Sequence, residues 1–394
     1  MEKKIKLKPA SVSAYSERVI LQILFKHGGW AHFCSDRFVI RAAELALALG
    51  LPSDLKLEEM GTLKAVRAAL QARYQALKLK RQAQPDKERI QLEKNLLAVA
   101  ASLHLSEVEL AILRLAAYMQ IEQPLKDALN LVGNQIDRRR FCNLLAGLVQ
   151  QPFDAIRVAL NEQEKLMRFG LLDRNRHNRD FDDHLQWGEA LDVDKLDVHP
   201  FSEEALLKRV LTASAPSSLN WKDFEHIAPM ANRARDYLNA AYQTHRKGVN
   251  LLLYGAPGTG KTEFASLLAQ QLNVACFTLS SMDEDEDLLS GKRKLKSAQL
   301  AQALLLGQRA LLIFDEVEDV FAGDLFRRSV AQEHKAWMNQ FLESNVVPMV
   351  WISNDVHCMD DAFIRRFDLV IEMPDIPYQN KLSLIKSLSS QQLE

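Results

Sequence analysis

The fold of this chain is decided by the stretch Gly255-Ala256-Pro257-Gly258-Thr259-Gly260-Lys261-Thr262. It matches the pattern G-x-x-x-x-G-K-[ST] and lies directly between an apolar run and a segment with helical spacing. The three glycines let the backbone curl so that consecutive N–H groups face a phosphate, and the next helix adds the partial positive charge of its N-terminus. The pattern in this context predicts a phosphate-binding loop.

Two side chains at the end of the loop carry the chemistry that such a loop needs. Lys261 places a positive charge where it can neutralise the β- and γ-phosphates of a nucleotide, and the Thr262 hydroxyl is a ligand type that Mg²⁺ accepts. A glycine turn followed by a chance lysine is the competing interpretation. The strand and helix patterns on either side of the loop disfavour it.

A second motif follows at residues 311–316, where an apolar run ends in Asp315 and Glu316. Ligands of α/β sheets bind beyond the carboxyl ends of the strands, which is where these two acids lie. We expect Asp315 to hold Mg²⁺ and Glu316 to polarise the water that attacks the γ-phosphate. Glu318 and Asp319 come next and are interpreted as surface charges.

In the C-terminal half, segments with strand patterns alternate with segments with helical patterns. Apolar runs separated by helical segments are typical of βαβ units with a buried parallel sheet. The pattern predicts a five-stranded, doubly wound α/β core over residues 221–378, after a linker at 201–220. The five predicted strands are 249–254, 274–279, 310–314, 347–352 and 369–373.

These motifs together resemble the AAA family of P-loop ATPases. Trp351-Ile-Ser-Asn354 is similar to the strand that ends in the family's polar sensor, which implies that Asn354 orients the attacking water or reads the γ-phosphate. Residues 360–368 are similar to the region whose arginines reach a neighbouring subunit's nucleotide, which implies that role for Arg365 and Arg366. The resemblance implies an oligomeric ring that hydrolyses ATP with Mg²⁺. A plain salt bridge is the alternative role for the two arginines.

Three further points concern this resemblance. His226 and Ile227 precede the core as the family's base-contacting segment does, so they are candidates for the adenine site. The segment 288–296 lacks the aromatic residue with which threading members grip a peptide, and its basic cluster either neutralises the acidic run 283–287 or contacts an acidic partner. Beyond residue 378 only the start of a helix, 379–394, remains, so we expect no helical lid: either the chain is a fragment or it works without one.

Before residue 200 the sequence is rich in helix-forming residues. We expect a basic helical region at 1–85, with 15 Lys and Arg against 7 Asp and Glu in residues 1–84, and a second helical domain at 86–200. Ser106-Glu-Val-Glu109 has the pattern of a capping box that starts a helix. Short helices followed by a strand pair favour a winged-helix-like unit, as in a bacterial group of the family that carries such a region before a single ATPase domain.

The composition, 47% hydrophobic and 26% charged, excludes a disordered chain or a fibrous repeat. No apolar run reaches the roughly 20 residues that span a bilayer, and no apolar segment follows the basic N-terminus as a signal peptide requires. The four separated cysteines are interpreted as reduced thiols of a cytoplasmic protein.

Three hypotheses for function remain open. The first is a ring-forming ATPase that remodels a protein bound, directly or through an adaptor, by the N-terminal region. The second is a nucleic-acid-associated ATPase that uses the basic first 84 residues. The third is a binding module that ATP gates with little turnover.

Overall fold

The computed structural model describes residues 7–34, 39–53, 60–79, 89–132, 135–175, 180–281, 289–321 and 335–375. The chain forms two compact units, Met1–Ser202 and Glu203–Glu394. In the described parts of the chain, no helix is both long enough and apolar enough to cross a membrane.

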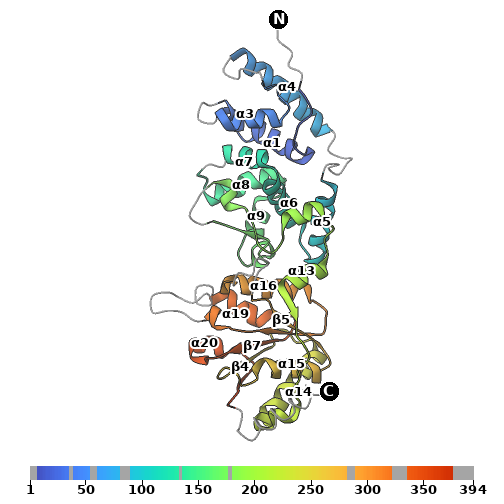
Figure 1. The fold of residues 1–394 in the computed structure, drawn as a ribbon. Helices are drawn as coiled ribbons and strands as arrows, with labels where there is room; N and C mark the ends of the chain where they lie inside the picture. Colours follow the sequence, from blue (N-terminus) through green and yellow to red (C-terminus); the bar gives the residue numbers. More distant parts are fainter. Residues whose placement is uncertain are drawn as a thin grey trace. The chain divides into compact units, whose positions relative to one another are not determined.

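The N-terminal unit is built almost entirely from helices (Figure 1). Ser106 begins α6 with the predicted capping box: its side chain accepts from the Glu109 N–H, and the Glu109 carboxylate accepts from the Ser106 N–H. This unit contains both ranges expected to be separate domains, 1–85 and 86–200, and the boundary between them stays a prediction. Its helices are α1 (Ala14–Lys26), α2 (Gly29–Phe33), α3 (Val39–Ala48), α4 (Met60–Leu79), α5 (Ile90–Ser102), α6 (Glu107–Ile121), α7 (Gln123–Val132), α8 (Arg138–Val149), α9 (Phe153–Ala159), α10 (Lys165–Arg168), α11 (Phe181–His184) and α12 (Val193–Val198).

One short antiparallel strand pair interrupts the helices of this unit. Strand β1 (Leu172–Asp173) pairs with β2 (Gln186–Trp187), after the helices α8 and α9. The sequence suggested short helices followed by a strand pair for a winged-helix-like unit, and here α11 lies in the chain between the two strands. The basic triplet Arg138–Arg140 forms the exposed first turn of α8, where Asp137 caps the helix.

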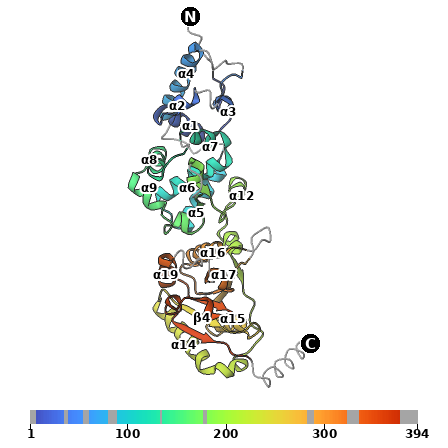
Figure 2. The same cartoon turned by 90° about the vertical axis from the view of Figure 1, so that its left-hand side faces the viewer.

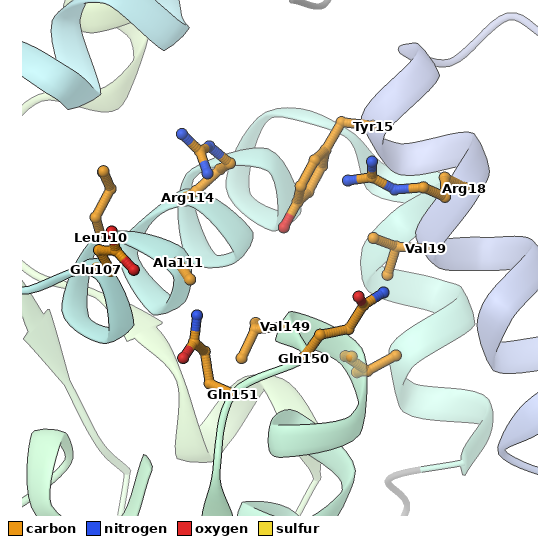
Figure 3. Close-up of a pocket in the computed structure, with 11 residues that line it drawn as sticks. Tyr15, Arg18, Val19, Glu107, Leu110, Ala111, Arg114, Val149, Gln150 and Gln151 are labelled. Atoms are coloured by element: carbon orange, nitrogen blue, oxygen red, sulfur yellow. The ribbon is translucent and has the colours of Figure 1, made fainter. Parts of the chain in front are cut away.

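A cavity of about 330 Å³ lies between α1, α6 and the end of α8 (Figure 3). The Tyr15 ring extends into it between two arginines, with the Arg18 guanidinium carbon 5.3 Å from the ring centroid. Arg114, on the α6 side, pairs with Glu93 over 3.0 Å. Burial raises the pKa of the Tyr15 phenol from 10.0 to about 12, although the two arginines act in the opposite direction.

The C-terminal unit is an α/β domain around one mixed sheet (Figure 2). The strand order is β3-β5-β6-β7-β4-β8, and every neighbouring pair is parallel except β3 with β5. The strands are β3 (Leu211–Ala213), β4 (Asn250–Tyr254), β5 (Ala275–Leu279), β6 (Ala310–Phe314), β7 (Met349–Ser353) and β8 (Leu369–Glu372). The helices are α13 (Glu203–Val210), η2 (Trp221–Ile227), α14 (Ala228–Thr244), α15 (Lys261–Gln271), α16 (Gly291–Leu304), α17 (Glu318–Phe321), α19 (Lys335–Ser344), η3 (Val356–Cys358) and α20 (Asp361–Ile364).

The predicted parallel core is confirmed, and the structure adds a sixth strand to it. The range 201–220, expected to be a linker, contains α13 and β3, and β3 pairs antiparallel with β5 at the edge of the sheet. A three-residue edge strand has too short an apolar pattern to be recognised in a sequence. This segment belongs to the α/β unit.

Both faces of the sheet are covered. Helices α14 and α15 lie on one side and α16 and α19 on the other (Figure 1). On the α14–α15 side the core includes Phe224, Phe264 and alternate strand residues such as Ile313. On the other side Trp351 of β7 stacks on Phe314 with ring centroids 4.7 Å apart. Burial on both faces explains why the strands read as continuous apolar runs.

Two predictions concern residues outside the described ranges. The acidic run 283–287 is one, and the helix start at 379–394 with its missing lid is the other.

Candidate functional site

The loop predicted to bind phosphate connects β4 to α15. Gly260 is the N-cap of α15 with φ +81°, a left-handed conformation that glycine adopts without steric cost. At Gly255 a Cβ atom would lie 2.2 Å from the Met373 carbonyl oxygen, so only glycine allows the loop to pass β8 this closely. The loop is therefore shaped by its glycines, and it presents the N-terminus of α15.

Lys261 is buried at the centre of the site. Its ammonium nitrogen donates to the carbonyls of Gly255 over 2.7 Å and Ala256 over 2.9 Å, and to Oδ1 of Asn354 over 3.1 Å. Burial lowers the pKa of the Lys261 ammonium from its ordinary value, while the carboxylates of Asp315 and Glu318 act in the opposite direction. These three contacts hold the positive charge above the loop, where a phosphate oxygen can replace the carbonyls.

Thr262, the residue after Lys261, contacts Asp315. The Thr262 hydroxyl donates to Oδ2 of Asp315 over 3.1 Å, although the residues lie on α15 and at the end of β6. A hydroxyl and a carboxylate this close are both hard oxygen ligands, and Mg²⁺ usually takes one or two protein oxygens together with substrate phosphates. The described residues contain no group of three or more His, Cys, Asp or Glu that could hold a metal alone. The pair fits a metal that a nucleotide helps to bind.

Glu316 follows Asp315 in an unusual backbone conformation. Its φ is +55°, and its N–H donates to Oδ1 of Asp315 over 2.8 Å. A left-handed conformation outside glycine costs on the order of 1 kcal/mol or more, and such residues cluster at functional sites. Its side chain is 61% exposed, with one oxygen 3.5 Å from the Lys294 ammonium of α16.

Asn354 reaches the site from the end of β7. Because β7 lies between β4 and β6, the sheet order brings the phosphate loop, Asp315 and Asn354 to one edge. With Oδ1 on the Lys261 ammonium, Nδ2 of Asn354 remains a donor. Asn354 thus lies beside the loop, and its role as a sensor stays a prediction.

Glu318 contacts the end of β7, which the sequence interpretation did not predict. It was expected to be a surface charge, but it is only partly exposed, and its Oε1 accepts from the Asn354 backbone N–H and lies 3.0 Å from the Ser353 hydroxyl. An acid four residues beyond a strand gives no local signal of this contact, because its partners belong to a different strand. The side chain of Asp319 lies outside the described residues.

His226 and Ile227 lie in η2 beside the loop. Phe224 of the same segment packs against Phe264 with ring centroids 5.1 Å apart, and its ring lies 3.5 Å from where a Cβ of Gly260 would stand. Ile227 is buried in the core. Among the described residues, neither ring nitrogen of His226 has a hydrogen-bond partner, although both are buried. Buried polar atoms without partners are rare, so this ring is suited to a ligand.

The two arginines after α20 have different environments. Arg366 pairs with Glu343 of α19. Arg365 is exposed, and its side chain has no hydrogen-bond or ion-pair partner among the described residues. Within the same ranges, no hydrogen bond joins either arginine to the loop.

Comparisons with known proteins find similarity in the part of the chain that contains this site. Residues 251–375 match the model of the ATPase family associated with various cellular activities (AAA). The chain is 30% identical over 154 residues to the proteasome-activating nucleotidase of Methanoculleus marisnigri, covering 36% of each chain. It is 30% identical over 153 residues to spastin of Naegleria gruberi, covering 35% of this chain and 28% of spastin.

One further relative and one solved structure are also similar to this chain. The ATP-dependent zinc metalloprotease FtsH of Malacoplasma penetrans is 30% identical over 153 residues, which are 18% of its length. The crystal structure of the FIGL-1 AAA domain matches 47% of this chain with a TM-score of 0.34 and 15% identity. The chain spans between 18% and 36% of the length of the three curated relatives named here, and 65% of the FIGL-1 domain. Residues 251–375, which include the phosphate loop, Asp315 and Asn354, match the AAA family of ATPases.

Proposed function

We propose that this protein hydrolyses ATP with Mg²⁺ and uses the cycle to remodel a protein partner as an oligomeric ring. One observation carries the proposal. The side chains of Lys261, Thr262, Asp315 and Asn354 come from three different parts of the sheet and are joined by hydrogen bonds at its carboxyl edge.

Each of these residues has its own role in the proposed hydrolysis of ATP. Lys261 and the N–H groups of the loop hold the β- and γ-phosphates. Thr262 and Asp315 hold Mg²⁺, which neutralises charge on the phosphate oxygens when bound. Glu316 accepts the proton of a water that attacks the γ-phosphate in line, and Nδ2 of Asn354 orients that water.

The adenine base is proposed to lie against η2. His226 and Ile227 lie beside the loop, and the unpartnered ring nitrogens of His226 offer a donor and an acceptor to the edge of the base. A weaker ATP affinity of a His226→Ala variant, with unchanged maximal turnover, is the expected result.

The proposals of a ring and of a protein partner rest on different observations. The exposed Arg365 is suited to reach a neighbouring subunit's phosphates, since a guanidinium is planar and always charged. The names of the matching relatives, a proteasome-activating nucleotidase among them, favour a protein as the target. The N-terminal unit is proposed to bind this protein or an adaptor. We also propose that the protein is cytoplasmic.

The test uses the full chain and two variants. Lys261→Ala removes the phosphate contact and should abolish binding of a fluorescent ATP analogue. Glu316→Gln removes the base but keeps the shape, so it should bind ATP and release phosphate slowly; a loss on the order of 10²-fold or more is expected for a general base. Normal turnover of Glu316→Gln contradicts the assignment.

Light scattering with and without Mg-ATP tests the ring. If ATP drives the chain into a larger oligomer and activity per chain rises with protein concentration, the arginines act between subunits. Steeply salt-dependent DNA binding that stimulates turnover would instead favour the nucleic-acid hypothesis. Partner binding that depends on ATP but is unchanged in Glu316→Gln would favour the gated module.

A further inference from the structure

Lys294 is a buried cation in the helix that follows β5. It is 3% exposed, whereas Lys292 on the same turn of α16 is exposed. Ser290 caps α16, so the basic cluster that contains Lys294 is helical. Near a helix N-terminus a cation is unfavourable, and burying an ammonium costs several kcal/mol. The position of Lys294 therefore needs a reason beyond the stability of α16.

One partner of this buried charge lies at the end of β6. The Lys294 ammonium is 3.5 Å from Oε2 of Glu316. The Lys294 side chain is buried. The Glu316 side chain is 61% exposed, so without this contact it could turn into solvent. The backbone of Glu316 is in a left-handed conformation, and the hydrogen bond from its N–H to Asp315 holds it independently of Lys294. The ammonium is the charged contact that selects one orientation of the carboxylate.

We propose that Lys294 is a positioning residue that orients the Glu316 carboxylate for water activation and so makes turnover depend on the placement of α16. This inference rests on the proposed function, because Glu316 must first be the base. A carboxylate displaced by about 1 Å can lose on the order of 10²-fold in rate. Lys294 acts through Glu316 and has no part in holding the nucleotide.

The experiment is a double-mutant cycle in the full chain. Lys294→Met removes the charge at similar volume, and the cycle contains wild type, Lys294→Met, Glu316→Gln and the double variant. Lys292→Met is the matched control, since it makes the same substitution at an exposed position of the same helix. Turnover of γ-labelled ATP under single-turnover conditions and the affinity for a fluorescent ATP analogue are measured for each protein.

We expect Lys294→Met to lower the hydrolysis rate between about 10-fold and 100-fold with nucleotide affinity within twofold of wild type. In the Glu316→Gln background the same substitution should change the rate by less than about twofold, because groups that act as a unit are not additive. Lys292→Met should match wild type. A purely structural role would not produce this dependence on Glu316.

Other outcomes overturn the inference. Equal losses in both backgrounds, or a loss of nucleotide affinity in Lys294→Met, would show that Lys294 supports the fold of the site. A faster rate would show that it restrains Glu316. If Glu316→Gln itself hydrolyses ATP normally, the proposed function fails first, whatever Lys294 does. Should Lys294→Met fail to fold, the same cycle with Lys294→Gln decides.

Discussion

The ammonium nitrogen of Lys261 donates a hydrogen bond to Oδ1 of Asn354 over 3.1 Å. The two residues follow neighbouring parallel strands, β4 and β7, whose register pairs Tyr254 with Ser353. The contact therefore links the phosphate loop to the strand end that is proposed to sense the attacking water. It also fixes the amide orientation, since an ammonium cannot face Nδ2.

This contact leads to a prediction about Asn354. In Asn354→Ala the water loses its donor, so turnover should fall by about 10²-fold, while ATP affinity falls less because the loop amides remain. Asn354→Asp keeps an oxygen for Lys261 but has no N–H. Steady-state kinetics should therefore find both variants slow. If Asn354→Asp retains wild-type turnover, the residue serves only to hold the lysine.

Glu318 should matter to catalysis without touching the nucleotide. Its carboxylate accepts from the Asn354 N–H and lies beside the Ser353 hydroxyl, so Glu318→Ala releases the end of β7. Turnover should fall about 10-fold with little change in KM. Glu318→Gln keeps an acceptor oxygen and should recover most of the rate. A Glu318→Ala effect that persists in full in an Asn354→Ala background would rule out this route.

The sequence predicted the α/β core and its loop well because its motifs determine local geometry, whereas the roles of the site residues stay predictions. A glycine pattern between a strand and a helix can form only a few loops, and Asp315 at a strand end must lie at the carboxyl edge of the sheet. What the motifs do not encode is which strands are neighbours. The contact between Glu318 and Asn354 depends on β6 lying beside β7, and so it was missed.

Lys294 and β3 show two other limits of sequence interpretation. A lysine inside a basic cluster looks solvated, because charge is visible in a sequence and burial on one helical face is not. The edge strand β3 has three residues and pairs antiparallel, so neither its length nor its pattern resembles the five buried strands. In the N-terminal unit the helices were predictable from composition and caps, but their packing was not.

Tyr15 predicts how the N-terminal unit responds to alkaline pH. Its phenol has a pKa of 10.0 in the unfolded chain and about 12 when folded, mainly because of burial. Between these values the folded state keeps a proton that the unfolded state releases, so stability falls as pH rises through this window. Tyr15→Phe removes this contribution.

The Tyr15→Phe variant should therefore lose less stability between pH 9 and pH 12 than wild type. Urea unfolding followed by circular dichroism at several pH values measures the difference between the two proteins. Other tyrosines contribute equally to both and cancel. Parallel loss of stability in the two proteins would mean that the Tyr15 phenol titrates alike in the folded and unfolded states.

Arg365 and Arg366 should differ in importance because their environments differ. Arg366 is engaged by Glu343, whereas Arg365 is exposed and its side chain has no such partner among the described residues. We expect Arg365→Ala to lower turnover by about 10³-fold, as loss of an arginine finger does, and Arg366→Ala to have a smaller effect. Both variants should still bind ATP, because the arginine completes a neighbour's site.

Mixing variants tests whether Arg365 acts across a subunit boundary. An Arg365→Ala subunit keeps its own loop, and a Lys261→Ala subunit keeps its arginine, so each inactive protein supplies what the other lacks. In an equal mixture, roughly a quarter of the interfaces pair an intact loop with an intact arginine, and activity should recover to about that share of wild type. A Lys261→Ala/Arg365→Ala protein supplies neither group and should restore nothing. Mixed oligomers that form by light scattering yet stay inactive at every ratio would place Arg365 in its own subunit's chemistry or outside catalysis.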